Sequence, residues 1–240
     1  MKSEIGVIGG MGPLASAAFV RSLYALYQGQ VEQALPAVRL YSDPSMGDRT
    51  TVLLGGGDPA PLLRKLESDI RRLVDEKVQR IVICCVTVHH LLPRLAPELR
   101  RHVTSLIDLA IQELGRARKR CLIACSTGTN KLRIFQRHAE WEQVAPWAVF
   151  PSDEEQELLH ESIYRLKRYH VTQPLIEVLA RIAANHRVEA ILAGCTELHL
   201  LSPLYAGCSE LNQTYEFLDP LSAAARLLME EEGHAPEVCS

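Results

Sequence analysis

The sequence predicts an α/β fold in which two similar, mainly parallel sheets are covered by helices. Two observations carry this prediction. Short apolar runs rich in Val, Ile and Leu alternate with longer amphipathic stretches along the 240 residues. The alternation also restarts near residue 120, and each half contains a glycine-bearing turn and, later, an apolar strand that ends in cysteine.

The first half is expected to hold three strands and three long helices. Gly9-Gly10-Met11-Gly12-Pro13 ends the first strand, and Pro13 suits the first turn of the helix that follows. Leu62, Leu66 and Ile70 recur at helical spacing. The apolar run 80–84 is typical of a strand covered on both faces. The expected strands are Glu4–Ile8, Ala37–Tyr41 and Arg80–Cys84, and the expected helices are Leu14–Gln28, Pro59–Glu76 and Leu106–Arg118.

The second half is expected to repeat this order. A turn over residues 126–129 leads into a helix that runs to about Glu140. Acidic residues open the helix 153–169, where they complement its dipole. The expected strands are Arg120–Ala124, Trp147–Phe150, Val188–Gly194 and Phe217–Asp219, and the further helices are Asp153–Tyr169, Thr172–Asn185, a start at Thr196–Leu201, and Leu221–Glu232.

The pattern indicates an internal duplication. Gly12 precedes Cys85 by about as many residues as Gly128 precedes Cys195, and threonine follows each cysteine closely. We therefore expect a first domain of residues 1–115, joined by a C-terminal helix at about 216–240, and a second domain of residues 116–215. No linker-like segment separates the halves, so they should pack tightly.

Composition excludes several function classes. The net charge of -3 comes without a basic stripe, which argues against a nucleic-acid partner. No apolar run reaches the roughly 18 residues of a membrane span, and the start lacks a signal-peptide pattern. We expect a cytoplasmic protein with no membrane partner. The seven cysteines form no CxxC pair, so no disulfide framework is expected, and Cys84 and Cys121 should fill core positions.

Ligands of open parallel sheets bind beyond the carboxyl ends of the strands. The glycine-rich turn at 9–12 and the cysteines at 85 and 195 all follow strand ends in this assignment. The turn does not read GxGxxG, and no acidic residue ends the second strand, so a dinucleotide site is disfavoured. A plain tight turn and a backbone site for a substrate carboxylate both stay open.

A single strand-end cysteine is more often a core residue than a nucleophile. The paired placement of Cys85 and Cys195 changes this interpretation, because a nearby helix N-terminus lowers a thiol pKa from about 8.5 toward neutrality. Two thiols that flank one carbon can move protons between its two faces. A thiolate removes the α-proton from one face, and the other thiol delivers a proton to the opposite face. This pattern is typical of a racemase.

Histidines 89, 90 and 199 follow these cysteines. Zinc sites built from Cys85/His89 and Cys195/His199 do not match the usual spacings, so no metal is expected. The histidines would then hydrogen-bond the thiols or fill structure. Arg49 in a loop is either a solvated charge or, at the mouth of a cleft, a bidentate ligand for a carboxylate. Lys167 lies on a predicted amphipathic helix, and its position alone favours a solvated charge.

The motifs resemble those of the aspartate/glutamate racemase superfamily. Three segments carry the resemblance: Gly9-Gly10-Met11-Gly12-Pro13, Cys85-x-Thr87-x-His89 and Gly194-Cys195-Thr196-Glu197-Leu198. Two more are similar to the aspartate racemase branch: Asp43-Pro44…Asp48-Arg49-Thr50 and Ile163-Tyr164-x-Leu166-Lys167. The motifs are co-linear over nearly the whole chain.

The resemblance implies two α/β domains related by pseudo-twofold symmetry, an active site between them, a homodimer, and racemisation without pyridoxal phosphate, metal or other cofactor. It implies that Cys85 and Cys195 are catalytic and that Glu197 and His199 tune them. Arg49 and Lys167 would hold a side-chain carboxylate, which favours an acidic amino acid, aspartate first and glutamate second. The implied substrate-binding positions are Met11, Arg49, Val86, Thr87, Val88, Thr129, Lys167 and Thr196.

One position departs from the family pattern. The family usually has asparagine after the first cysteine, where its amide helps to hold the α-carboxylate, whereas this chain has Val86. Losing a hydrogen bond to a charged group costs about 1.5–3 kcal/mol. The alternatives are therefore a related isomerase or lyase acting on a non-proteinogenic or other small carboxylic acid, and a catalytically weak small-acid sensor.

Overall fold

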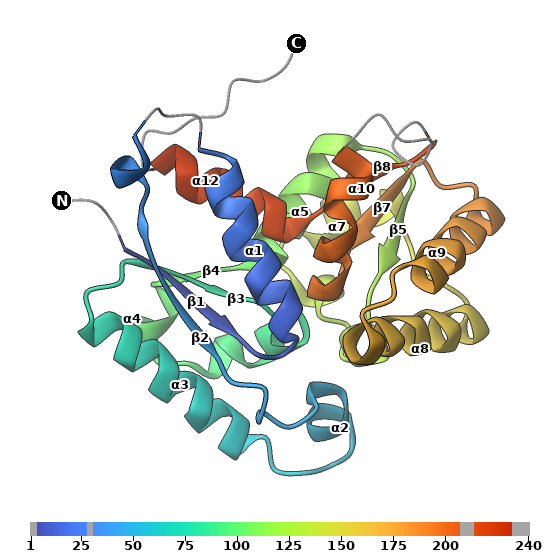
Figure 1. Cartoon of the computed structure of the whole chain (residues 1–240). Helices are drawn as coiled ribbons and strands as arrows, with labels where there is room; N and C mark the ends of the chain where they lie inside the picture. The colour runs from blue at the N-terminus through green and yellow to red at the C-terminus, as the bar shows by residue number, and fades with distance from the viewer. Residues whose placement is uncertain (1–3, 28–30, 207–213, 232–240) are drawn as a thin grey trace.

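Two four-stranded parallel sheets stand side by side in the computed structural model, which describes residues 4–27, 31–206 and 214–231 (Figure 1). The first sheet has the order β2-β1-β3-β4 and the second β6-β5-β7-β8. Equivalent strands therefore occupy equivalent places, which confirms the prediction of two similar parallel sheets. The strands are β1 (Glu4–Gly9), β2 (Ala37–Ser42), β3 (Arg80–Ile83), β4 (Val103–Thr104), β5 (Cys121–Ala124), β6 (Ala148–Val149), β7 (Ala190–Ala193) and β8 (Glu216–Leu218).

Helices cover the first sheet as the apolar periodicity predicts. Pro13 occupies the first turn of α1, and Ser105 caps α5 by accepting a hydrogen bond from the Asp108 N–H. A short 3-10 helix follows Cys85 directly. The elements are α1 (Pro13–Ala25), α2 (Arg49–Leu54), α3 (Ala60–Asp75), α4 (Pro97–Arg100) and α5 (Leu106–Ala117), with the 3-10 helices η1 (Glu32–Ala34) and η2 (Thr87–Arg94).

The second half repeats this layout. Ser152 and Glu155 form a capping box that starts α8, and a 3-10 helix again follows the strand-end cysteine. The helices are α6 (Thr127–Lys131), α7 (Trp141–Val144), α8 (Asp153–Tyr169), α9 (Gln173–His186), α10 (Ser202–Ala206) and α12 (Pro220–Glu231), with the 3-10 helices η3 (Phe135–Arg137), η4 (Ala145–Trp147) and η5 (Thr196–Leu201).

Three expectations from the sequence need correction. The helix expected to run to Glu140 ends at Lys131, because Arg133 has a left-handed backbone with φ of 53°. Strand β8 pairs with β7, so residues 216–218 belong to the second sheet and not to the first domain. The two-residue strand β4 and the helix α2 were not expected. Asp48 starts α2 by accepting a hydrogen bond from the Thr51 N–H at 2.8 Å.

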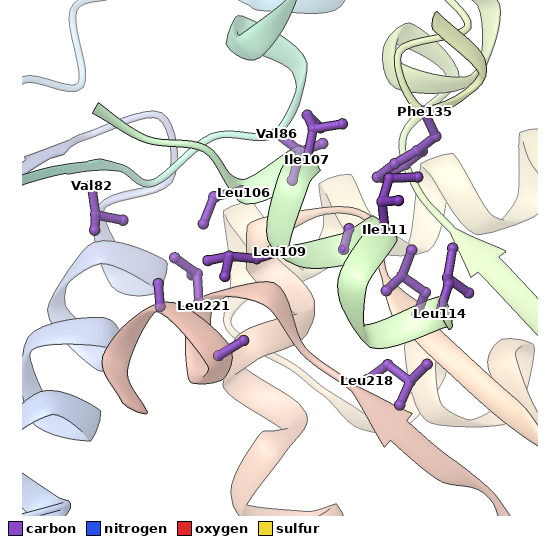
Figure 2. Close-up of a cluster of buried hydrophobic side chains, with 14 of the residues drawn as sticks. Val82, Val86, Leu106, Ile107, Leu109, Ile111, Leu114, Phe135, Leu218 and Leu221 are labelled. Atoms are coloured by element: carbon purple, nitrogen blue, oxygen red, sulfur yellow. The ribbon is translucent and has the colours of Figure 1, made fainter. Parts of the chain in front are cut away.

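One hydrophobic core joins the two halves. Its buried side chains come from β1 and β3 of the first sheet, from β5 and β7 of the second, and from α1, α5 and α12. Figure 2 shows α5 at its centre, with Leu106 and Leu109 on the side of Leu221 of α12, and Ile111 on the side of Phe135. Full burial of one such side chain contributes about 1.5–3 kcal/mol. The halves are therefore held by a continuous core rather than by a thin contact.

Over the described ranges, 4–27, 31–206 and 214–231, no helix combines the length and apolar character that a bilayer crossing requires.

Truncation of α5 in this shared core should destabilise the whole chain. Ile111→Ala removes a side chain that is 2% exposed, and we expect the free energy of unfolding to fall by about 2–5 kcal/mol. Urea unfolding followed by circular dichroism measures this change. Gln112→Ala, on the exposed face of the same helix, is the control and should stay within about 0.5 kcal/mol of the parent. Equal effects of the two substitutions would contradict the shared core.

Candidate active site

The two strand-end cysteines meet at one cavity between the halves. β3 ends at Ile83 and β7 at Ala193, and Cys85 and Cys195 follow as the chain turns into η2 and η5. Both thiols line the same cavity. The hydroxyl of Thr196 donates to the carbonyl of Cys84 at 3.2 Å, so the segments carrying the two cysteines are directly bonded across the interface. The cleft predicted at the strand ends therefore exists.

The cavity is small and closed. It holds about 10 Å³, which is room for roughly one water molecule. A molecule the size of an amino acid can enter only when the walls move apart. Both halves supply the walls, so a separation of the halves would open the site. The lining residues are Met11, Asp48, Arg49, Thr50, Cys85, Val86, Thr87, Ser126, Tyr164, Lys167, Cys195, Thr196 and Glu197.

Cys195 is bonded to a buried carboxylate. Its thiol donates to Glu197 Oε2 at 2.9 Å, and Lys167 Nζ lies 3.4 Å from the other oxygen, Oε1. Burial raises the pKa of the Cys195 thiol well above its ordinary value; the Glu197 carboxylate raises it further, and Lys167 lowers it. A thiolate and a carboxylate would repel each other at this distance, so the pair must hold one proton. Cys195 is the protonated member in the resting site.

Lys167 stays charged although it is largely buried. Burial would lower its pKa, but Glu197 and the two cysteines raise it above the ordinary value. The Lys167 ammonium also lies 4.8 Å from the centre of the Tyr164 ring. The site therefore contains a fixed positive charge on α8 that faces both thiols.

The glycine-rich turn at residues 9–12 leaves space for the Glu197 carboxylate. A Cβ atom at Gly12 would lie 2.2 Å from Glu197 Oε1, so only glycine allows this close approach between the halves. Gly10 has a φ of 87° and packs against the backbone of Asp43, where a side chain would collide. The turn at 9–12 therefore serves the site through its close packing.

Arg49 lies buried at the wall of the cavity. Its guanidinium donates to the carbonyls of Met11 at 2.7 Å and Gly47 at 3.0 Å. Burial would lower its pKa, but the neighbouring Cys85 and Asp48 raise it above the ordinary value. Its Nε–H has no hydrogen-bond partner among the described residues, and neither does Glu197 Oε1. The unpartnered Arg49 Nε–H thus belongs to the same cavity wall as the Lys167–Glu197 ion pair, in which Lys167 Nζ lies 3.4 Å from Glu197 Oε1.

Two further residues join the halves at the rim. Tyr164 on α8 donates to Asp48 Oδ2 at 2.5 Å, and burial together with this bond raises the pKa of Tyr164 to about 12. Thr50 lies so close to Gly128 that a Cβ there would be 2.6 Å from its hydroxyl. Asp48, Thr50, Ser126 and Tyr164 were not among the predicted site residues. Asp48, Thr50 and Tyr164 stand in the two motifs that resemble the aspartate racemase branch, next to Arg49 and one turn before Lys167, and that was their signal, whereas Ser126 had none.

Hydroxyl groups form a second polar wall. The Thr87 hydroxyl lies 2.9 Å from that of Thr129 and 3.3 Å from that of Ser126. Thr87 and Ser126 line the cavity, whereas Thr129 stands behind them. Val86 lines the cavity and also packs in the shared core, so it offers no side-chain donor.

Besides Thr129, two predicted site residues do not line the cavity, namely Val88 and His199. Val88 is fully buried in the core of the first half, because the turn of η2 directs it there. His199 Nδ1 lies 2.5 Å from Asp219 Oδ2, and its Nε2 lies 3.0 Å from the Ser22 hydroxyl. This Ser–His–Asp relay ties η5 to α1 and to the end of β8. Because Ser22 lies inside α1, its backbone N–H is used by the helix and cannot form an oxyanion hole.

The histidine after Cys85 is also fully engaged. His89 Nε2 accepts from the Leu106 N–H at 3.1 Å, and Nδ1 therefore donates to the Cys85 carbonyl at 2.8 Å. Burial lowers the pKa of His89 to about 4, so the ring is neutral. His89 fixes the Cys85 segment to the start of α5. Among the described residues no group of three or more His, Cys, Asp or Glu side chains could hold a metal ion.

The fold and this site can now be compared with known proteins. A model of the family Asp/Glu/hydantoin racemase matches residues 8–228. An aspartate racemase from Picrophilus torridus shares 23% identity and has a TM-score of 0.81, with 96% of this chain and 94% of that chain covered. A glutamate racemase from Francisella tularensis subsp. tularensis SCHU S4, solved in complex with D-glutamate, shares 13% identity, with a TM-score of 0.63 and coverage of 100% and 85%.

One similar solved structure is a racemase named for allantoin, which is not an acidic amino acid. An allantoin racemase from Klebsiella pneumoniae shares 17% identity and has a TM-score of 0.59, with 98% of this chain and 91% of that chain covered. At these identities the structures show a shared fold, and the family match carries the assignment. It confirms the resemblance seen in the motifs: this chain belongs to the Asp/Glu/hydantoin racemase family.

Proposed function

We propose that the protein racemises an acidic amino acid, aspartate first and glutamate second, by proton transfer between Cys85 and Cys195. One observation carries the proposal: two thiols from equivalent strand ends of the two halves line a single closed cavity. A racemase accepts both enantiomers, so it needs an acid–base group on each side of the α-carbon. Two similar halves that face each other supply such a pair.

The proposed reaction has two proton transfers. One cysteine thiolate takes the α-proton, and the electron pair of the broken C–H bond is left on a carbanion conjugated with the α-carboxylate. The other thiol gives its proton to the opposite face, and it becomes the thiolate. The Cys195–Glu197 pair holds a proton in the resting site. Cys195 is therefore the resting acid, and we assign the opposite face of the α-carbon to Cys85, whose neighbour is Arg49.

The charges at the cavity match a dicarboxylic amino acid. Arg49 and Lys167 offer two cations for two carboxylates, and the Glu197 carboxylate, which forms an ion pair with Lys167, offers one anion for the ammonium group. Asp48 is already engaged, because its two oxygens accept from Thr51 and Tyr164. The unpaired Arg49 Nε–H and the negatively charged Glu197 carboxylate are suited to the opposite ends of an α-amino acid.

Removing either thiol should stop racemisation. Incubation with L-aspartate or D-aspartate, without added cofactor, should produce the opposite enantiomer, which chiral chromatography measures. Cys85→Ser and Cys195→Ser should each lower kcat at least 1,000-fold, because a hydroxyl is a far weaker base at neutral pH. Cys84→Ala is the control, since this neighbouring thiol is buried in the core outside the cavity. Normal turnover in either serine variant would overturn the proposal.

Removing either charged neighbour of Cys195 should shift the pKa of its thiol, and the two removals should shift it in opposite directions. In a Cys85→Ser background, the alkylation rate of Cys195 by iodoacetamide reports its thiolate as pH rises. Glu197→Gln removes the carboxylate that raises the pKa of Cys195, so the midpoint should move to lower pH. Lys167→Gln removes the cation that lowers this pKa, so the midpoint should move to higher pH. Shifts of the same sign in both variants would contradict the described site.

Lys167 should also decide substrate charge. The parent should prefer aspartate to asparagine, and Lys167→Gln should narrow the ratio of their kcat/KM values at least tenfold. The reason is that the substituted side chain no longer offers a positive charge to the second carboxylate. Arg165→Gln, two residues away on the exposed face of α8, should leave the ratio unchanged. If Lys167→Gln still prefers aspartate to asparagine as strongly as the parent does, a residue other than Lys167 recognises the second carboxylate.

A further inference from the structure

A second, larger cavity lies outside the candidate active site. It measures about 500 Å³, a size typical of small-molecule sites. Its walls come from both halves: η2, α4 and the start of α5 on one side, and the segment around η3 on the other. The side chains of Leu92, Ile107 and Ile134 are buried and form an apolar floor.

The rim of this cavity carries uncompensated positive charge. Arg100, Arg101 and Arg137 all line it, and none forms an ion pair with any described carboxylate. The single lining carboxylate, Asp108, pairs with His138 at 3.3 Å. The rim thus carries three guanidinium groups against one carboxylate, which leaves an excess of positive charge around the apolar floor.

Two neighbouring features, His90 and the start of α5, indicate the same positive electrostatic potential. Burial lowers the pKa of His90, and the charges of Arg137 and Arg94 lower it further. Arg137 from the second half lies 3.4 Å from His90 Nδ1 of the first half. The N-terminal turn of α5, a helix of 12 residues, also contributes Ser105 and Ile107 to the wall. The helix dipole therefore adds to the arginine charges.

We propose that this cavity binds a small organic oxyanion, in which a phosphate or carboxylate group is attached to an apolar body. The arginines Arg100 and Arg137 hold the oxyanion from opposite halves, and the floor receives the apolar part. Neither feature alone would select such a ligand. An inorganic anion leaves the apolar floor uncovered, and a neutral apolar molecule leaves the arginines unpaired.

A ligand in this cavity would contact both halves at once. Its binding free energy would then oppose their separation. His89 connects this cavity to the Cys85 segment, because it lines the cavity and also bonds the Cys85 carbonyl and the start of α5. The binding site itself does not depend on the proposed racemisation.

Calorimetry with phenyl phosphate, benzoate, inorganic phosphate and phenol tests the site. In low-salt buffer phenyl phosphate or benzoate should bind, and which of them binds more tightly distinguishes a phosphate from a carboxylate ligand. Inorganic phosphate and phenol should bind at least tenfold more weakly than the better organic anion. The double variant Arg100→Ala/Arg137→Ala should weaken that binding at least tenfold. Raising the salt to about 0.5 M should weaken it as well, since the arginines are exposed.

Three controls keep the test decisive. Arg165→Ala/Arg181→Ala removes two exposed charges from α8 and α9 and should bind the probe as the parent does. Lys167→Gln should also bind normally, because it alters only the candidate active site. Binding that is lost in Lys167→Gln but kept in Arg100→Ala/Arg137→Ala would overturn the proposal. Failure of the parent to bind either organic anion would also overturn the proposal. The proposal is overturned in the same way if the parent binds no probe and sedimentation shows that the arginine variant dissociates an oligomer of the parent.

Discussion

The shared hydrophobic core is the constraint on which the site depends. Side chains from both sheets pack with α5 and α12 in one continuous cluster, so the carboxyl ends of the two sheets face each other. Sequence duplication alone would give two separate strand ends, each with one cysteine. Packing the halves against α5 brings the cysteines to one cavity, where the Thr196–Cys84 hydrogen bond fixes the contact.

Burial of charge explains the rest of the site. Glu197 is 2% exposed, and a buried carboxylate is costly unless it is paired. Lys167, the Cys195 thiol and the space left by Gly12 together make its position tolerable. The same arrangement keeps the Cys195 thiol protonated, and Arg49 lies near Cys85, which is the asymmetry that the proposed proton transfer would use. The cavity is too small for an amino acid, so its walls must move apart to admit one.

Much of this could be predicted from the sequence, and the failures have physical causes. The alternation of apolar and amphipathic runs predicted both sheets, and the strand-end cysteines predicted the cleft. The helix after Thr127 was predicted too long, because nothing local announces the left-handed backbone at Arg133. Tyr164 and Val88 show the limits at the site. Tyr164 reaches Asp48 from a distant helix, and the Val88 side chain turns into the core. Only tertiary packing decides in which direction such side chains point.

The central claim is that each thiol serves one face of the α-carbon. The most direct measurement is α-proton exchange in deuterated water, followed by NMR for each enantiomer of aspartate with Cys85→Ser and with Cys195→Ser. Each single variant keeps one thiol, so each should exchange the α-proton of one enantiomer without forming the other, and the two variants should favour opposite enantiomers. Exchange of the same enantiomer by both variants, or racemisation by either, would contradict the account.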